Sequence, residues 1–137
     1  DQKYWASIDL ENAVAEKRFT TGIHRYHHIL VDEFQDVNPL DLALLKNIAL
    51  VNKGQLCIIG DDDQAIYEWR GATPQFILNP EKHIESGYKT HILERNYRSP
   101  KNIVEISQRL IKHNRNRVGK NVQAVSTEKA QIEVVEQ

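Results

Sequence analysis

Short aliphatic runs alternate along the chain with stretches whose apolar residues are spaced as in helices. Between Lys3 and Phe19 the apolar positions recur loosely at helical spacing between charged residues, which predicts an amphipathic helix. Continuous apolar runs at 28–31 and 56–59 are short and rich in β-branched residues. They predict strands buried on both faces, as in a parallel sheet. A third short strand is expected at 90–93.

Two helices are predicted from their start signals. Asn38–Pro39 has the composition of an N-cap followed by a first helical residue, and this helix should stop near Gly54. Ser99–Pro100 begins a second helix, which should run to about His113. A strand, a helix and a strand in succession imply a crossover and a parallel strand pair. The predicted fold class is therefore α/β, with a parallel sheet and flanking helices.

Patterning is weaker at the C-terminal end. Residues 114–130 have the composition of a linker, and residues 131–137 alternate weakly, as an edge strand would. The one cysteine, Cys57, lies inside the second apolar run and is expected to be a small buried hydrophobe.

Composition narrows the class of protein. The chain has 137 residues, 40% hydrophobic and 27% charged, with 18 Lys+Arg against 19 Asp+Glu, so it is not a globally basic nucleic-acid coat. No apolar run approaches the roughly 20 residues that span a bilayer. With one cysteine and no disulfide framework, a cytoplasmic protein without a membrane partner is expected. A chain that begins at Asp1 and contains no methionine is also expected to be a fragment.

Charge is unevenly distributed. Residues 32–63 contain seven acids and two lysines, a net charge of −5. Residues 95–120 contain eight Lys/Arg and one acid, a net charge of +7. This pattern indicates an acidic site near the strand ends and a basic C-terminal third.

The first apolar run ends in Asp32 and Glu33. Ligands of parallel α/β sheets bind at the carboxyl ends of the strands. One of two adjacent carboxylates could hold Mg²⁺ while the other orients or deprotonates a water molecule. The alternative is that the two acids only end a strand and solvate the following turn.

The later strand ends carry groups suited to phosphate and nucleic acid. Gln64 can donate to a terminal phosphate oxygen, while Tyr67, Trp69 and Arg70 could stack on and pair with single-stranded nucleic acid. The alternative is that the two aromatic residues pack in a core or an interface. Tyr97–Arg98 combines a stacking ring with a guanidinium for phosphate.

Three ordered segments resemble motifs II, III and IV of the UvrD/Rep/PcrA family of superfamily 1 DNA helicases. They are Val31-Asp32-Glu33-Phe34-Gln35-Asp36, Gly60-Asp61-Asp62-Asp63-Gln64-Ala65-Ile66-Tyr67-Glu68-Trp69-Arg70-Gly71-Ala72 and Asn96-Tyr97-Arg98-Ser99. The resemblance covers residues 26 to about 116 and adds little outside them.

This resemblance implies an ATP-driven motor that moves 3′ to 5′ on single-stranded DNA and unwinds duplexes. Its cofactors would be ATP and Mg²⁺, and its DNA partners single strands and single-strand/duplex junctions. Two RecA-like P-loop NTPase domains would clamp ATP between them. Residues 1–98 would be the C-terminal part of the first domain, and residues 99–137 the linker and edge strand that begin the second.

The resemblance also assigns roles on the nucleotide side. Asp32 resembles the Walker B acid that holds Mg²⁺, and Glu33 the base that activates the attacking water, next to the metal. Gln64 resembles the sensor of the terminal phosphate. Tyr97 and Arg98 resemble the adenine-stacking residue and the arginine on the terminal phosphate.

On the DNA side, Tyr67 and Trp69 fall where the family contacts the strand, and Arg70 where it links the two sites. Asp36 and Asp61 are expected to have network roles around Mg²⁺ and Gln64.

The chain departs from the family by lacking the phosphate-cradling G-x-x-x-x-G-K-[ST] loop. Its Gly119–Lys120 pair has Asn114 where the first glycine belongs and Asn121 in place of Ser or Thr. The later motifs of the second domain are missing as well. The rest of a parent chain would have to supply them, and the fragment alone is expected to hydrolyse little ATP.

Two other functions fit part of the pattern. Asp61 and Asp63, with an acid at the first strand end, are spaced as in a metal-dependent nuclease or a Toprim-like phosphoryl-transfer site. That interpretation leaves Gln64–Gly71 and Asn96–Ser99 unexplained. The basic stretch 95–120 suits a non-catalytic module that binds DNA or a partner.

Overall fold

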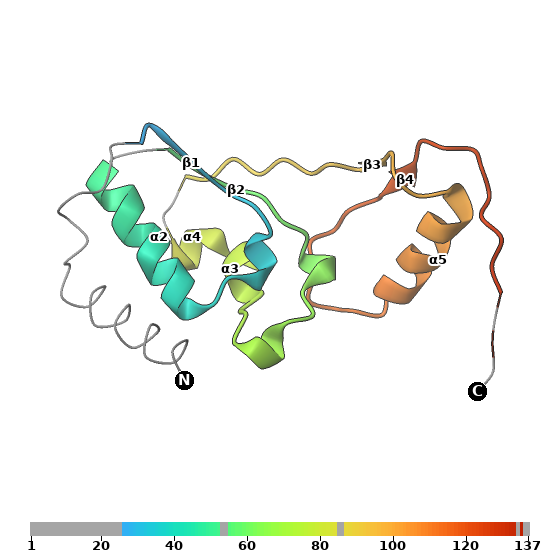
Figure 1. Cartoon of the computed structure of the whole chain (residues 1–137), viewed down its shortest axis with the longest axis horizontal. Coiled ribbons are helices and arrows are strands. Elements are labelled where there is room, and N and C mark those ends of the chain that lie inside the picture. The colour runs from blue at the N-terminus through green and yellow to red at the C-terminus, as the bar shows by residue number, and fades with distance from the viewer. Residues whose placement is uncertain (1–25, 53–54, 85–86, 134, 136–137) are drawn as a thin grey trace. The chain divides into compact units, whose positions relative to one another are not determined.

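A computed structural model describes residues 26–52, 55–84, 87–133 and 135 (Figure 1). The chain divides into two compact units, of which the first ends at Tyr88 and the second begins at Lys89. The helix predicted at 3–19 lies outside the described residues. Helices and small parallel sheets occur in both units, in agreement with the predicted α/β class.

In the first unit, β1 (His28–Val31) and β2 (Gln55–Ile58) form a parallel pair. Ile29 lies opposite Leu56, and Val31 opposite Ile58. The α-helix α2 (Pro39–Asn52) follows β1 in the chain and precedes β2, which confirms the predicted strand, helix and strand. No helix in the described ranges is both long and apolar enough to cross a membrane.

The start of α2 is fixed by reciprocal capping. The Asn38 side-chain oxygen accepts from the backbone N–H groups of Leu40 at 2.8 Å and Asp41 at 3.0 Å. The Asp41 carboxylate accepts in return from the backbone N–H of Asn38 at 3.3 Å. These bonds satisfy amides that the first helical turn leaves without partners, which confirms Asn38 as the N-cap.

The core of the first unit lies against one face of the β1–β2 pair. It is centred on Phe34, which is fully buried, with Val37, Leu42 and Phe76 around it. Val31 and Ile58 pack against this cluster from the strands. The helices α2, α3 (Gln75–Leu78) and α4 (Pro80–His83) lie on one side of the two strands (Figure 1).

Burial on both faces, predicted for the strands, is wrong. Exposure alternates along β1 and β2, and Leu30 keeps 67% of its surface accessible. Cys57 is exposed too, contrary to the prediction of a buried thiol. The reason is that α2, α3 and α4 cover one face of the pair, while the described residues leave His28, Leu30 and Cys57 uncovered on the other.

In the second unit, β3 (Arg95–Asn96) pairs in parallel with β4 (Gln123–Ala124). The helix α5 (Lys101–Ile111) confirms the helix predicted to follow Ser99, but it begins one residue later than expected, because Pro100 has an extended backbone and occupies the N-cap position without a side-chain cap. Its side chains also reach the C-terminal segment. Asn102 exchanges two hydrogen bonds with the backbone of Ala130, at 2.8 and 3.0 Å.

The strand predicted at 90–93 is wrong, since the segment forms no strand and Leu93 is 88% exposed. The neighbouring backbone does pair, but two residues later, at β3. The partner strand β4 falls inside the predicted linker. Residues 131–133 form no strand, and residues 134, 136 and 137 of the predicted edge strand lie outside the described ranges.

Two acidic segments, residues 32–36 after β1 and residues 60–64 after β2, lie close together. The backbone N–H of Ile59 donates to the Val31 carbonyl at 2.8 Å, and that of Phe34 donates to the Ile59 carbonyl at 2.9 Å. A Cβ built on Gly60 would lie 2.6 Å from Gln35 Oε1 and 3.0 Å from the Phe34 nitrogen. The close packing therefore requires glycine at this position.

We predict that Gly60→Ala lowers the free energy of unfolding by about 1–3 kcal/mol, because the added methyl group forces the packed segments apart. Urea denaturation of the 137-residue chain measures the change. Gly119→Ala is the matched control, since a Cβ there meets no atom within 4 Å. Equal stability of the two variants would contradict the close-packing explanation.

Candidate functional site

The two predicted acids directly follow β1. Glu33 has a left-handed backbone, with φ 51° and ψ 42°, and precedes the 3₁₀ helix η2 (Phe34–Asp36). Its N–H donates to Asp32 Oδ1 at 2.9 Å. Both acids are exposed, so their carboxylates are accessible to a ligand. The unusual backbone conformation directs the chain inward, where Phe34 and Gln35 are buried.

Gln35 joins the first acidic segment to the second. Its side-chain nitrogen donates to Glu33 Oε2 at 2.7 Å, and its side-chain oxygen accepts from the backbone N–H of Asp61 at 3.0 Å. Only 2% of its surface is exposed. A buried amide is stable when its polar atoms are paired, and here both ends of the amide have partners.

Asp61 holds the second segment in place. One of its carboxylate oxygens accepts from the Asp63 N–H at 3.1 Å, which caps the 3₁₀ helix η3 (Asp62–Gln64). The other oxygen accepts from the Gln64 side-chain amide at 2.8 Å. Four residues therefore form a continuous linkage in the order Glu33, Gln35, Asp61 and Gln64.

Asp36 is the last residue of η2. Its N–H donates to the Glu33 carbonyl at 2.9 Å. Its Oδ1 atom is buried and has no hydrogen-bond partner among the described residues. In those same residues no group of three or more His, Cys, Asp or Glu side chains is arranged to hold a metal ion.

An exposed cluster of rings and a cation follows η3. Trp69 and Arg70 belong to the 3₁₀ helix η4 (Glu68–Arg70), and Tyr67 is its N-cap. The guanidinium carbon of Arg70 lies 4.5 Å from the centre of the Trp69 ring and 5.2 Å from that of Tyr67. Trp69 is 73% exposed and so is not a core residue in the described structure. Together these groups offer stacking faces and a positive charge to a ligand.

The remaining predicted residues lie in the second unit, directly after β3. The Asn96 side-chain oxygen accepts from the N–H groups of Arg98 at 3.0 Å and Ser99 at 2.8 Å. This turn leaves Tyr97 72% exposed and Arg98 exposed at the surface. Both side chains are therefore available to a ligand.

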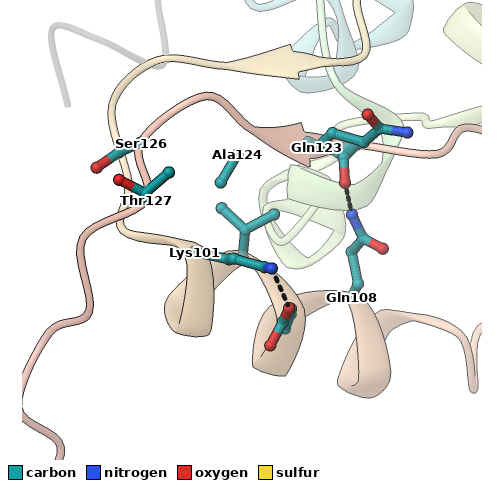
Figure 2. A pocket seen from close by; sticks show the side chains of 9 residues that line it. Lys101, Gln108, Gln123, Ala124, Ser126 and Thr127 are labelled. Atoms are coloured by element: carbon teal, nitrogen blue, oxygen red, sulfur yellow. Dashed lines mark hydrogen bonds and ion pairs between the residues drawn. The ribbon is translucent and has the colours of Figure 1, made fainter.

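The second unit also contains a cavity of about 380 Å³ between α5 and the segment around β4. Lys101 and Gln108 line it from α5, with Ser126 and Thr127 beyond β4 (Figure 2). Gln108 donates to the Val122 carbonyl, and Lys101 pairs with Glu105 at 3.9 Å. None of the site residues predicted from the sequence lines this cavity.

Of the predicted residues, Glu33, Asp61 and Gln64 are brought into one hydrogen-bonded linkage. Tyr67, Trp69 and Arg70 form a separate cluster three to six residues after Gln64. Sequence reasoning assigned no role to Gln35, although it connects the two segments. One signal was present in the sequence, since Gln35 is a polar residue that lies between the apolar positions Phe34 and Val37, two residues after Glu33.

Comparison with known proteins places these features in a family. The profile of the UvrD/REP helicase N-terminal domain matches residues 10–85, more than half of the chain. The chain is 46% identical over 98 residues to DNA helicase II of Haemophilus influenzae. It is 44% identical over 99 residues to the ATP-dependent DNA helicase PcrA of Staphylococcus epidermidis. With the PcrA of Staphylococcus aureus it shares 40% over 113 residues.

These alignments cover 72% of this chain in the first two cases and 82% in the third, but only 13–15% of the relatives. The profile match begins before β1 and includes the segments that follow β1 and β2 as well as η4. The chain therefore belongs to the UvrD/REP helicase N-terminal domain family.

Proposed function

We propose that this chain is part of an ATP-dependent DNA helicase, which couples ATP hydrolysis to 3′ to 5′ movement on single-stranded DNA and to duplex unwinding. Family membership and relatives named as DNA helicases support the general activity. The observation that carries the proposal is the linkage from Glu33 to Gln64. It connects the proposed hydrolytic residue to the segment that leads into Tyr67, Trp69 and Arg70.

On the nucleotide side, Asp32 and Glu33 provide carboxylate oxygens, the ligands that Mg²⁺ prefers. A cation in this region is supported by the exposed carboxylates and by the buried Oδ1 of Asp36, which has no hydrogen-bond partner within the described ranges. The bound metal would neutralise charge on the phosphates. Asp32 would hold it, and Glu33 would also orient and deprotonate the attacking water.

Gln64 would sense the terminal phosphate. Its amide nitrogen donates to Asp61, so its side chain is held in one orientation before ATP binds. In the second unit, Tyr97 would stack on adenine, and Arg98 would pair with the terminal phosphate. The turn capped by Asn96 supports this assignment because it fixes the backbone that carries both residues.

On the DNA side, Trp69 would stack on a base of a single strand or of a single-strand/duplex junction. Tyr67 would contact the strand, and Arg70 would link the DNA and nucleotide sites. Stacking on exposed rings binds any base, because every base has a π-face. A motor that moves along DNA of any sequence needs this tolerance.

In this proposal the fold is RecA-like. Residues 1–98 belong to the first P-loop NTPase domain and residues 99–137 begin the second. The 137 residues contain no G-x-x-x-x-G-K-[ST] loop, so the phosphate cradle would come from the rest of the parent chain. Activity is accordingly a property of the parent protein.

We predict that Glu33→Gln in the parent protein lowers DNA-stimulated ATP hydrolysis by about 10²–10⁴-fold, because the amide cannot accept a proton from water. ATP binding should survive, since the side-chain size is kept. Phosphate release and nucleotide-binding assays measure the two properties. Glu81→Gln, on an exposed residue of α4, is the matched control. Retained hydrolysis in Glu33→Gln would falsify the base assignment.

We predict that Trp69→Ala weakens binding of a labelled oligothymidine by about tenfold or more, because stacking contributes roughly 1–3 kcal/mol per base. Trp69→Phe keeps an aromatic face and should retain most of the affinity. Fluorescence anisotropy of the parent protein at fixed salt measures both variants. Equal affinity of Trp69→Ala and the unmodified protein would remove Trp69 from the DNA contact.

A further inference from the structure

Gln35 is the only buried polar side chain in the part of the chain that the structure describes. It lies beside the fully buried Phe34 and is 2% exposed. Burial of an amide costs free energy unless its polar atoms are paired, so an apolar side chain would suit a purely structural role here. The presence of a buried amide at position 35 is explained by the two groups that it contacts.

The orientation of the amide is determined by its two partners. The Asp61 backbone N–H can only donate, and it meets Gln35 Oε1 at 3.0 Å. The ionised Glu33 carboxylate can only accept, and its Oε2 meets Gln35 Nε2 at 2.7 Å. The reversed amide would oppose donor to donor and acceptor to acceptor. Gln35 therefore holds one oxygen of Glu33 in a fixed position.

Close packing restricts the amide further. A Cβ on Gly60 would lie 2.6 Å from Gln35 Oε1, so no space remains there for the side chain to move towards Gly60. The Phe34 N–H donates to the Ile59 carbonyl at 2.9 Å and anchors the same turn. The Gln35 side chain is thus held by the fold before any ligand binds.

From Gln35 the linkage continues to Asp61 and Gln64 in the segment that follows β2. Gln35 accepts from the backbone of Asp61, and the Asp61 carboxylate accepts from the Gln64 amide at 2.8 Å. A shift of the Gln64 side chain towards a phosphate would therefore pull on the Asp61 carboxylate, and the backbone N–H of Asp61 is bonded to Gln35. Glu33 lies three hydrogen bonds from Gln64 along this path.

We propose that Gln35 is a positioning residue that orients the Glu33 carboxylate for hydrolysis and connects it to the Asp61–Gln64 pair. It does not contact the reacting atoms and acts through Glu33. This inference rests on the proposed function, in which Glu33 is the base. One oxygen of Glu33 is occupied by the amide, which leaves the other to accept the proton from water.

The test uses the parent protein and the substitution Gln35→Met, which keeps the side-chain length and removes both hydrogen bonds. We expect kcat for DNA-stimulated ATP hydrolysis to fall by about 10–100-fold, the usual cost of losing a group that orients a catalytic residue. KM for ATP should change by less than about threefold, because binding contacts remain. Gln55→Met, on an exposed residue of β2, is the matched control and should leave kcat unchanged.

A double-mutant cycle with Glu33→Gln separates positioning from general loss of structure. If Gln35 acts through Glu33, adding Gln35→Met to Glu33→Gln lowers kcat no further. A purely structural role gives a further loss in that background and overturns the proposal, as does an unchanged kcat in Gln35→Met alone. If Glu33→Gln alone leaves hydrolysis intact, the base assignment of the proposed function has failed instead.

A second variant keeps the test decisive if Gln35→Met does not fold. Gln35→Glu keeps the acceptor for the Asp61 N–H and, when ionised, loses the donor to Glu33. We expect the same fall in kcat, again without a further fall in the Glu33→Gln background. Full activity of Gln35→Glu at a pH high enough to ionise the introduced carboxyl, whose pKa is raised by burial beside Glu33, would show that the bond to Glu33 is not needed.

Discussion

The parallel pairing of β1 with β2 is the interaction on which the rest of the first unit depends. It aligns Val31 with Ile58 and continues past the strands through the bonds between Ile59 and Val31 and between Phe34 and Ile59. The two acidic segments consequently leave the sheet at the same edge. They are near enough for a single glutamine side chain to join them.

Packing fixes this arrangement from one side. Phe34 is fully buried among residues of α2 and α3, and the same turn carries Glu33 on its exposed side. The site residues are thus attached to the best-packed part of the unit while their carboxylates face outward. A rigid support with accessible functional groups is what positioning of a nucleotide requires.

Local signals in the sequence were sufficient for much of the fold. Asn38 marks the start of α2 because capping depends on neighbouring residues only, and Pro100 directly precedes the first residue of α5. The exposure of Leu30 and Cys57 could not be predicted in the same way, since it depends on what covers the second face of the sheet. The strands β3 and β4 have two residues each, too few for any periodicity to identify.

For the candidate site, the sequence indicated the acids and Gln64 because their residue types and places at strand ends are suggestive in themselves. The bridging role of Gln35 depends on a contact with Asp61, which lies 26 residues away. No local pattern encodes that contact. The roles of Tyr97 and Arg98 remain predictions, and both residues lie in the second unit.

The left-handed backbone of Glu33 has a consequence for the evolution of this position. A residue with a Cβ in this conformation stores strain on the order of 1–3 kcal/mol, which glycine would relieve. The carboxylate that the proposed hydrolysis needs and the residue that the backbone favours are therefore different. A selection for thermal tolerance alone would replace Glu33 with glycine or asparagine, whereas a selection for turnover would restore the acid at the expense of stability.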